Sequence, residues 1–168
     1  MLEAINRQIN AEIWSAYLYL SMSNWCAHNG YEGMAAWLRV QSHEEFDHSE
    51  VFSHYVLRRS GHVQLLGIDD VPTDWQSPFH VFEELLRHEI KVTELIDDLT
   101  RLAIKEGDFA TQNRLQWFIE EQVEEENSAR QILADMHKYG QSDCNCGLQL
   151  LDKDLGLREY VPTYIQSI

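Results

Sequence analysis

A glutamate and a histidine stand three residues apart in the stretch EEFDHSE, residues 44–50. On a helix these positions lie on one face, so Glu45 and His48 would point the same way. A carboxylate and an imidazole directed at one point are good ligands for a divalent metal ion. Turned towards water, the same pair would be ordinary surface charge, which is the commoner situation for a single E-x-x-H.

The surrounding pattern favours an inward orientation. Glu45 and His48 fall on a line of residues at steps of three and four that is otherwise largely apolar. Three further helical stretches show the same arrangement, apolar at both ends and polar near the middle. The polar positions on these lines include Glu12, Gln41, Glu45, His48, Glu89, Gln122 and Glu125. Because each lies near the middle of its helix, they meet at one level of a bundle whichever way each helix runs.

The chain also reads as two related helical hairpins. Glu45 follows Glu12 by 33 residues, and Gln122 follows Glu89 by the same interval. Each half supplies one glutamate from its first helix and a pair at i and i+3 from its second. The two pairs are Glu45/His48 and Gln122/Glu125.

Four glutamates and one histidine thus converge, while the four apolar lines hold no Lys or Arg. Burying unpaired carboxylates costs several kcal/mol per charge. Two divalent cations would balance four carboxylates, and oxygen ligands with one imidazole and no thiolate suit iron or manganese. Two such ions about 3.5–4 Å apart would bind dioxygen and share the electrons of its reduction. Glu45 is best placed to bridge them, and the neutral Gln122 makes the second metal position the looser one.

Glycine and proline divide the sequence into the helices that must position these groups. We place long helices at about 2–28, 31–59, 78–106 and 109–139, and a short fifth at 148–155. Each long helix would span roughly 40–45 Å. Two short junctions force antiparallel neighbours, whereas residues 61–77 are long enough to travel the length of a bundle. The sequence predicts an all-α four-helix bundle with one long crossover and a short C-terminal helix.

Composition excludes several partners. Acidic residues outnumber basic ones 28 to 13, and the net charge of −15 disfavours nucleic acid and anionic membrane surfaces. No stretch approaches the roughly 18–20 apolar residues of a membrane span, and no signal-peptide pattern opens the chain. Three cysteines, Cys26, Cys144 and Cys146, cannot all pair within one chain, which favours the reducing cytoplasm.

These residues resemble those of prokaryotic non-haem ferritins, within the ferritin-like di-iron family. The likeness is carried by INRQINAEIWSAYLYLSMS, RVQSHEEFDHSE, HEIKVTELI and DFATQNRLQWFIEEQVEEEN. It covers one domain, residues 1–156, and leaves residues 157–168 as a C-terminal tail. The resemblance implies a cage of about 24 identical subunits. Such a cage oxidises Fe(II) with O2 or H2O2 and stores a ferric mineral inside.

The resemblance also implies three iron positions. Two form a ferroxidase centre that shares one bridging carboxylate, and the third lies near the inner surface. The implied ligands are Glu12, Glu45 and His48 for the first metal, Glu45, Glu89 and Glu125 for the second, and Glu44, Glu121, Glu124 and Glu125 for the third.

Other positions matched by the resemblance are not ligands. Tyr19 matches a tyrosine beside the centre that hydrogen-bonds or gives up an electron, a role that Trp117 would share. Gln122 matches a position near the oxygen-binding side. The haem-binding methionine of bacterioferritins is replaced here by Phe46, so haem is not expected at this point.

Two other functions compete with storage. A stand-alone di-iron peroxidase of the rubrerythrin type is one alternative, but that family usually adds a Cys₄ iron domain, which three cysteines cannot build. A non-enzymatic, metal-buffering helical assembly would pair its inward carboxylates with Lys or Arg. Outside the firm resemblance, Cys144 and Cys146 read as exposed thiols, with soft-metal binding or redox chemistry as the alternative. The tail residues Tyr160, Val161 and Ile165 would pack on a neighbouring subunit or be disordered.

Overall fold

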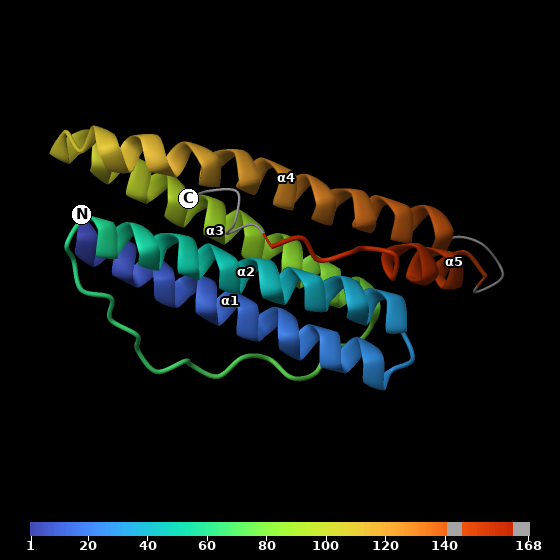
Figure 1. Ribbon diagram of the computed structural model, residues 1–168. Coiled ribbons are helices and arrows are strands. Elements are labelled where there is room, and N and C mark those ends of the chain that lie inside the picture. The colour runs from blue at the N-terminus through green and yellow to red at the C-terminus, as the bar shows by residue number, and fades with distance from the viewer. Residues whose placement is uncertain (141–145, 163–168) are drawn as a thin grey trace.

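Five α-helices and no strand make up the part of the chain that the computed structural model describes, residues 1–140 and 146–162. The long helices α1 (Leu2–His28), α2 (Glu32–Arg58), α3 (Pro78–Glu106) and α4 (Phe109–Gly140) lie side by side as a bundle (Figure 1). The short α5 (Cys146–Leu155) packs against α2 and α4 at one end. The predicted all-α four-helix bundle with a long crossover and a short fifth helix is confirmed.

The helix ends follow local chemistry. Ser77 Oγ accepts a hydrogen bond of 3.3 Å from the backbone N–H of His80, and Pro78 occupies the first helical position of α3. Gly107 ends α3 in the left-handed region with φ of 66°. The differences from the expected bounds are small: α5 begins at Cys146, two residues early. Cys144 lies outside the described residues, and Cys146 is exposed.

The crossover between α2 and α3 runs back along α1 (Figure 1). Two asparagines one turn apart on α1 hold its extended backbone. Asn6 donates to His62 O and accepts from Gln64 N, while Asn10 donates to Gln64 O and accepts from Leu66 N, all at 2.7–3.0 Å. Side-chain amides thus replace the strand partner that the extended segment lacks.

Two hydrophobic clusters fill the bundle on either side of a polar layer. One includes Trp37 and Phe82, whose ring centroids lie 5.6 Å apart. The other includes Phe52 stacked on Phe118, with centroids 3.9 Å apart. The polar residues predicted to interrupt the apolar lines, which form the seams between the helices, are all buried: Glu12, Gln41, Glu45, His48, Glu89, Gln122 and Glu125. The hydrophobic clusters therefore hold the polar middle of the helices together.

The helix α5 is fixed to α2 by backbone contact at Gly33. A methyl group at Gly33 would lie 1.6 Å from the carbonyl oxygen of Asp152, so only glycine fits there. The Asp152 carboxylate accepts a 2.8 Å hydrogen bond from the N–H of Met34 at the start of α2. This contact sets where the chain emerges after α5.

We expect Gly33→Ala to destabilise the protein by about 1–3 kcal/mol, because the overlap forces α5 off α2. Elsewhere in a helix the same change would stabilise by roughly 0.5–1 kcal/mol, so the sign of the effect is diagnostic. Thermal unfolding and hydrogen exchange of residues 146–155 would measure it. Gly67→Ala is the matched control, since a methyl group there meets nothing within 4 Å. A raised melting temperature with unchanged exchange in α5 would contradict the expectation.

The described part of the tail folds back on its own chain instead of being disordered. Arg158 hydrogen-bonds Gln41 and Glu44 on α2, and the hydroxyl of Tyr160 donates to Asp47 Oδ2 at 2.6 Å. The segment runs beside α2, towards the middle of the bundle (Figure 1). The expected packing of Ile165 falls outside the described residues.

Candidate metal centre

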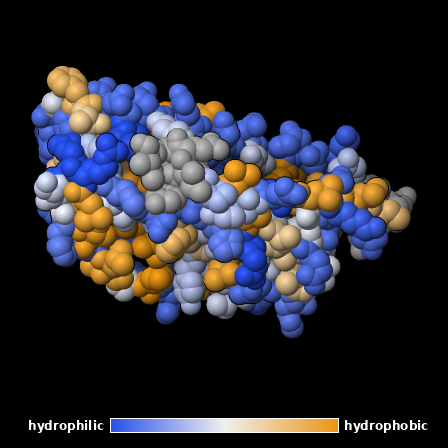
Figure 2. Space-filling view, in the orientation of Figure 1, coloured by the Kyte–Doolittle hydropathy of each residue, from blue (hydrophilic) through white to orange (hydrophobic). Residues whose placement is uncertain are grey.

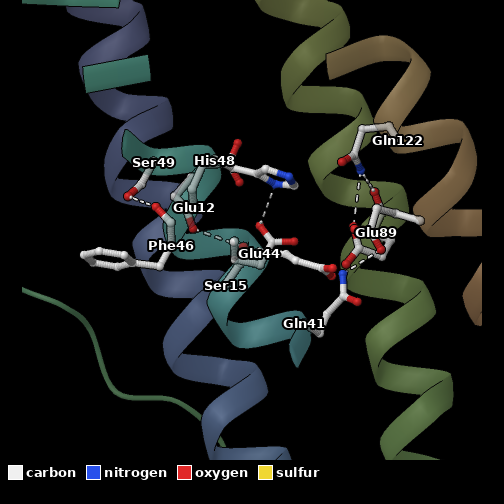
Figure 3. Close-up of polar contacts among 12 residues, drawn as sticks. Glu12, Ser15, Gln41, Glu44, Phe46, His48, Ser49, Glu89 and Gln122 are labelled. Carbon is white, nitrogen blue, oxygen red and sulfur yellow. Dashed lines mark hydrogen bonds and ion pairs between the residues drawn. The ribbon is translucent and has the colours of Figure 1, made fainter. Parts of the chain in front are cut away.

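Three ligand-type side chains meet inside the bundle between α1 and α2. One ligand atom from each of Glu12, Glu45 and His48 lies within 4.8 Å of the others. All three side chains are at most 2% exposed. Figure 3 shows His48 directed into the bundle and Phe46, its neighbour on α2, directed away. The side chains of Glu12, Glu45 and His48 thus point to one place, as their spacing on the two helices predicts.

Several atoms of this group have no partner among the described residues. Glu12 Oε2, both carboxylate oxygens of Glu45 and His48 Nε2 are buried without a hydrogen bond. His48 Nδ1 lies 3.6 Å from Glu45 Oε2, which is too long for a hydrogen bond. Buried polar atoms are normally paired, and those that are not commonly mark an ion or a reaction site. Three oxygens and one imidazole nitrogen are a donor set that fits a divalent metal ion.

The opposite side of the layer is hydrogen-bonded. Glu89 Oε1 accepts a hydrogen bond from the hydroxyl of Tyr19. Glu89 Oε2 accepts a second from Gln122 Nε2 at 3.2 Å (Figure 3). Glu125 Oε2 accepts from Gln41 Nε2 at 2.6 Å. Glu89 and Glu125 therefore stand outside the tight group of three. Their hydrogen bonds hold them within electrostatic reach of Glu45: the charge of Glu89 raises the pKa of Glu45, and that of Glu45 raises the pKa of Glu125.

Burial makes these carboxylates hard to ionise. The pKa of each buried glutamate, Glu12, Glu45, Glu89 and Glu125, is raised above its ordinary value of 4.5, chiefly because burial disfavours the charged form. Repulsion between the carboxylates raises it further: Glu45 acts on Glu12, and Glu89 acts on Glu45 and Glu125. A bound cation would reverse this by favouring the ionised form, with release of protons.

The carboxylates implied for the third iron position, Glu44, Glu121 and Glu124, differ in their surroundings. We call them the outer carboxylates because they lie outside the buried group of Glu12, Glu45 and His48. Glu44 and Glu121 are half-buried, and burial raises the pKa of both, whereas Glu124 is exposed. Glu44 also carries an ion pair with Arg158. The outer position is therefore electrostatically partnered, unlike the inner group.

Four residues near the site were missed or given no role from the sequence. Gln8 Nε2 donates to Glu12 Oε1 at 2.9 Å, and its spacing of four residues on α1 was a usable signal. Gln41 was placed on its helix seam without a partner. Asp47 has no role in the sequence-based prediction, yet it is buried and accepts a hydrogen bond from Tyr160. Arg158 had no local signal, since 114 residues separate it from Glu44.

Aromatic rings close the site beside His48. The rings of Trp117 and Phe118 meet the imidazole edge-on, with centroids 5.5 and 5.9 Å away. These rings limit the positions open to the imidazole and exclude water from that side. Trp117 therefore has a packing role here, and its proposed share in electron transfer stays a prediction.

Comparison with known proteins agrees with this geometry. Residues 2–138 match the family described as the ferritin-like domain. A bacterial non-heme ferritin of Bacteroides fragilis is 42% identical over 155 residues, which cover 92% of this chain and 95% of that protein. This chain belongs to the ferritin family. A bacterial non-heme ferritin of Campylobacter jejuni is 35% identical over 153 residues, or 91% of this chain and 90% of that one.

Solved ferritin structures share the fold. An open pore ferritin from the hyperthermophilic archaeon Archaeoglobus fulgidus superposes with a TM-score of 0.92 at 45% identity, covering 95% of this chain and 97% of that one. An engineered closed form of the Archaeoglobus fulgidus ferritin gives the same TM-score. The predicted resemblance to prokaryotic non-haem ferritins is confirmed. None of the helices within the described residues of this ferritin combines the length and apolar character needed to cross a membrane.

Proposed function

We propose that this ferritin is an iron-storage subunit that oxidises Fe(II) at the buried carboxylate centre and deposits Fe(III) inside a homo-oligomeric cage. One observation carries the proposal. Ligand atoms of Glu12, Glu45 and His48 lie within 4.8 Å of one another, and several polar atoms of these side chains are buried without a hydrogen bond, in a layer between two hydrophobic clusters. Iron is the substrate, and the chain needs no haem or other organic group for this chemistry.

The residues divide into two iron positions that share Glu45. The first Fe(II) is held by Glu12, Glu45 and His48, and the second by Glu45, Glu89 and Glu125. Each iron gives up one electron. O2 takes the two electrons and two protons to become H2O2, or H2O2 takes them to become two water molecules. Carboxyl groups protonated in the empty site release their protons as iron binds.

Tyr19 and Gln122 act through the second position. The Tyr19 hydroxyl and the Gln122 amide both donate to Glu89, which holds that carboxylate in place while the metal enters and leaves. The third iron position, at Glu44, Glu121 and Glu124, would receive Fe(III) on its way to the cavity.

Exposed apolar residues support the assembly of several copies. Leu65, Leu66 and Ile68 of the crossover are 51–67% exposed. Figure 2 shows hydrophobic side chains gathered at the end of the molecule where the crossover begins. Patches of this kind mark protein contacts. We place this face in contacts between identical subunits, in a cage of about 24 copies within the cytoplasm.

Aerobic loading tests the storage function. Many equivalents of Fe(II) per chain are added, and ferric absorbance is followed together with the particle mass by sedimentation. We expect absorbance and mass to rise together well beyond two irons per chain. A small particle that stops at two irons per chain would contradict storage and would favour a peroxidase of the rubrerythrin type.

The neutral side chain of Gln122 limits the affinity of the second metal position. Gln122→Glu should tighten the second equivalent of Zn²⁺, a redox-inert probe, by about tenfold, because a further carboxylate then faces Glu89. Isothermal titration of the assembled protein measures the change. Gln116→Glu, an exposed position on the same helix, is the matched control. Equal tightening in both variants would show a general charge effect and not a local one.

A further inference from the structure

The tail after α5 brings one cation to the acidic face of α2. Arg158 Nη1 donates to Gln41 Oε1 at 2.7 Å, and Nη2 donates to Glu44 Oε2. The guanidinium also lies over the ring of Trp37, 4.5 Å from its centroid. Contacts in three directions fix the planar head group, as bidentate and stacked sites for arginine do. Arg158 is therefore held in one position.

This position lies among the outer carboxylates. The positive charge of Arg158 lowers the pKa of both Glu44 and Glu121, opposing the rise that burial causes. Glu44 and Glu121 come from different helices, α2 and α4, so the guanidinium acts on both walls of the outer position. In the described structure, this arginine supplies the positive charge that a metal ion would otherwise bring.

Arg158 is also linked to the inner site through Gln41. A guanidinium only donates hydrogen bonds, so Gln41 must turn its carbonyl oxygen towards Arg158. The amide NH2 of Gln41 is then left to donate to Glu125 Oε2, at 2.6 Å. Arg158 thus orients the side chain that holds Glu125.

The tail is anchored on both sides of this arginine. Before it, the Asp152 carboxylate bonds the N–H of Met34, and after it, Tyr160 bonds Asp47. The ring of Tyr160 also lies 5.3 Å from that of His43, centroid to centroid. Because Asp152 and Tyr160 keep the tail attached on either side, Arg158 can leave Glu44 with only a local loosening of residues 157–162 and return to the same place.

We infer that Arg158 is a resident counter-cation of the outer carboxylates, and that it is displaced each time a metal ion occupies Glu44 and Glu121. The inference rests on the proposed function, because it assumes that iron passes this point. A metal ion and a guanidinium compete for the Glu44 carboxylate. The competition weakens metal binding at the outer position and keeps it a point of passage. The returning arginine turns Gln41 back towards Glu125.

Titration of Zn²⁺ into the assembled, iron-free protein tests the inference. The wild type should bind two equivalents per chain strongly and a third weakly. In Arg158→Gln the third equivalent should bind about tenfold more tightly, with the first two changed less than threefold. Arg158→Lys retains the charge and should stay within about threefold of the wild type. Arg39→Gln, which removes an exposed charge from α2, should match the wild type.

Hydrogen exchange of residues 157–162 gives a readout that is independent of affinity. Filling the third equivalent should speed exchange there in the wild type, whereas the first two equivalents should not. The inference would be overturned if the wild type and Arg158→Gln bind the third Zn²⁺ equivalent with the same affinity. It would also be overturned if Arg158→Gln and Arg158→Lys increase that affinity equally. If the wild type binds no two Zn²⁺ equivalents strongly, the result would instead contradict the proposed ferroxidase centre.

Discussion

Replacing Glu45 and His48 together by alanine is expected to slow the fast phase of Fe(II) oxidation by more than about 100-fold. The double variant removes the proposed bridging carboxylate and the one imidazole of the centre. Because His48 Nδ1 and Glu45 Oε2 lie only 3.6 Å apart, the double replacement avoids leaving one of these two buried groups without the other. Stopped-flow absorbance of ferric species after mixing with aerobic Fe(II) measures the rate.

The chain offers a matched control in His80 and Glu83. These residues lie three positions apart on α3, with Nε2 and Oε2 3.9 Å apart, but both side chains are about 44% exposed. Their double replacement by alanine should leave the rate unchanged. Particle size should be normal for both double variants. An unchanged rate in the Glu45/His48 variant with intact assembly would show that oxidation occurs elsewhere.

The second large effect concerns the stability of the metal-free protein. The four buried glutamates bind protons more tightly in the folded state than in the unfolded chain, because burial raises their pKa above 4.5. Their contribution to stability is fully present below pH 4.5 and is lost as the pH rises through the raised values. As the pH rises above 4.5, these groups should make the empty protein progressively less stable.

Comparison with Glu45→Gln isolates this effect. Burial lowers the pKa of His88 to about 4, so His88 contributes with the opposite sign up to its ordinary 6.5. Asp108, with a pKa lowered to about 2 by the hydrogen bond from Arg59, acts only below 3.8. Both contributions are common to the two proteins and cancel in the difference. The melting temperature of metal-free Glu45→Gln should exceed that of the wild type, and the gap should widen from pH 5 to pH 8.

Metal binding should make the wild type melt at a higher temperature than Glu45→Gln. Zn²⁺ at about 1,000 times its dissociation constant adds about 4 kcal/mol per site, which raises the melting temperature of the wild type by about 10 °C. Glu45→Gln lacks the bridging carboxylate and should gain much less. A gap between the two metal-free proteins that narrows as the pH rises would contradict the account of the buried carboxylates.

Much of the fold could be predicted because it depends on local patterns. Apolar steps of three and four define each long helix, and Ser77-Pro78 and Gly107 mark where α3 begins and ends. The polar interruptions at Glu12, Glu45 and His48 also follow from spacing, since a regular helix turns each position in a known direction. These three came together as expected.

The surroundings of the second metal position were not predictable in the same way. Glu89 and Glu125 lie on the expected seams, yet their oxygens turn to Tyr19, Gln122 and Gln41. Spacing gives the direction of a side chain from its helix. It does not give the last torsion angles, which depend on donors brought by other helices. The roles assigned to these two glutamates therefore remain predictions.

The helices, their order and the level at which the acidic residues meet follow from the sequence, because helical periodicity is a property of neighbours along the chain. Which groups lie beside those acidic residues depends on the folded chain. It brought Arg158 to Glu44 across 114 positions through the backbone contact of α5 at Gly33. No periodic pattern encodes such a contact, since it depends on where a short helix docks and not on which face it presents.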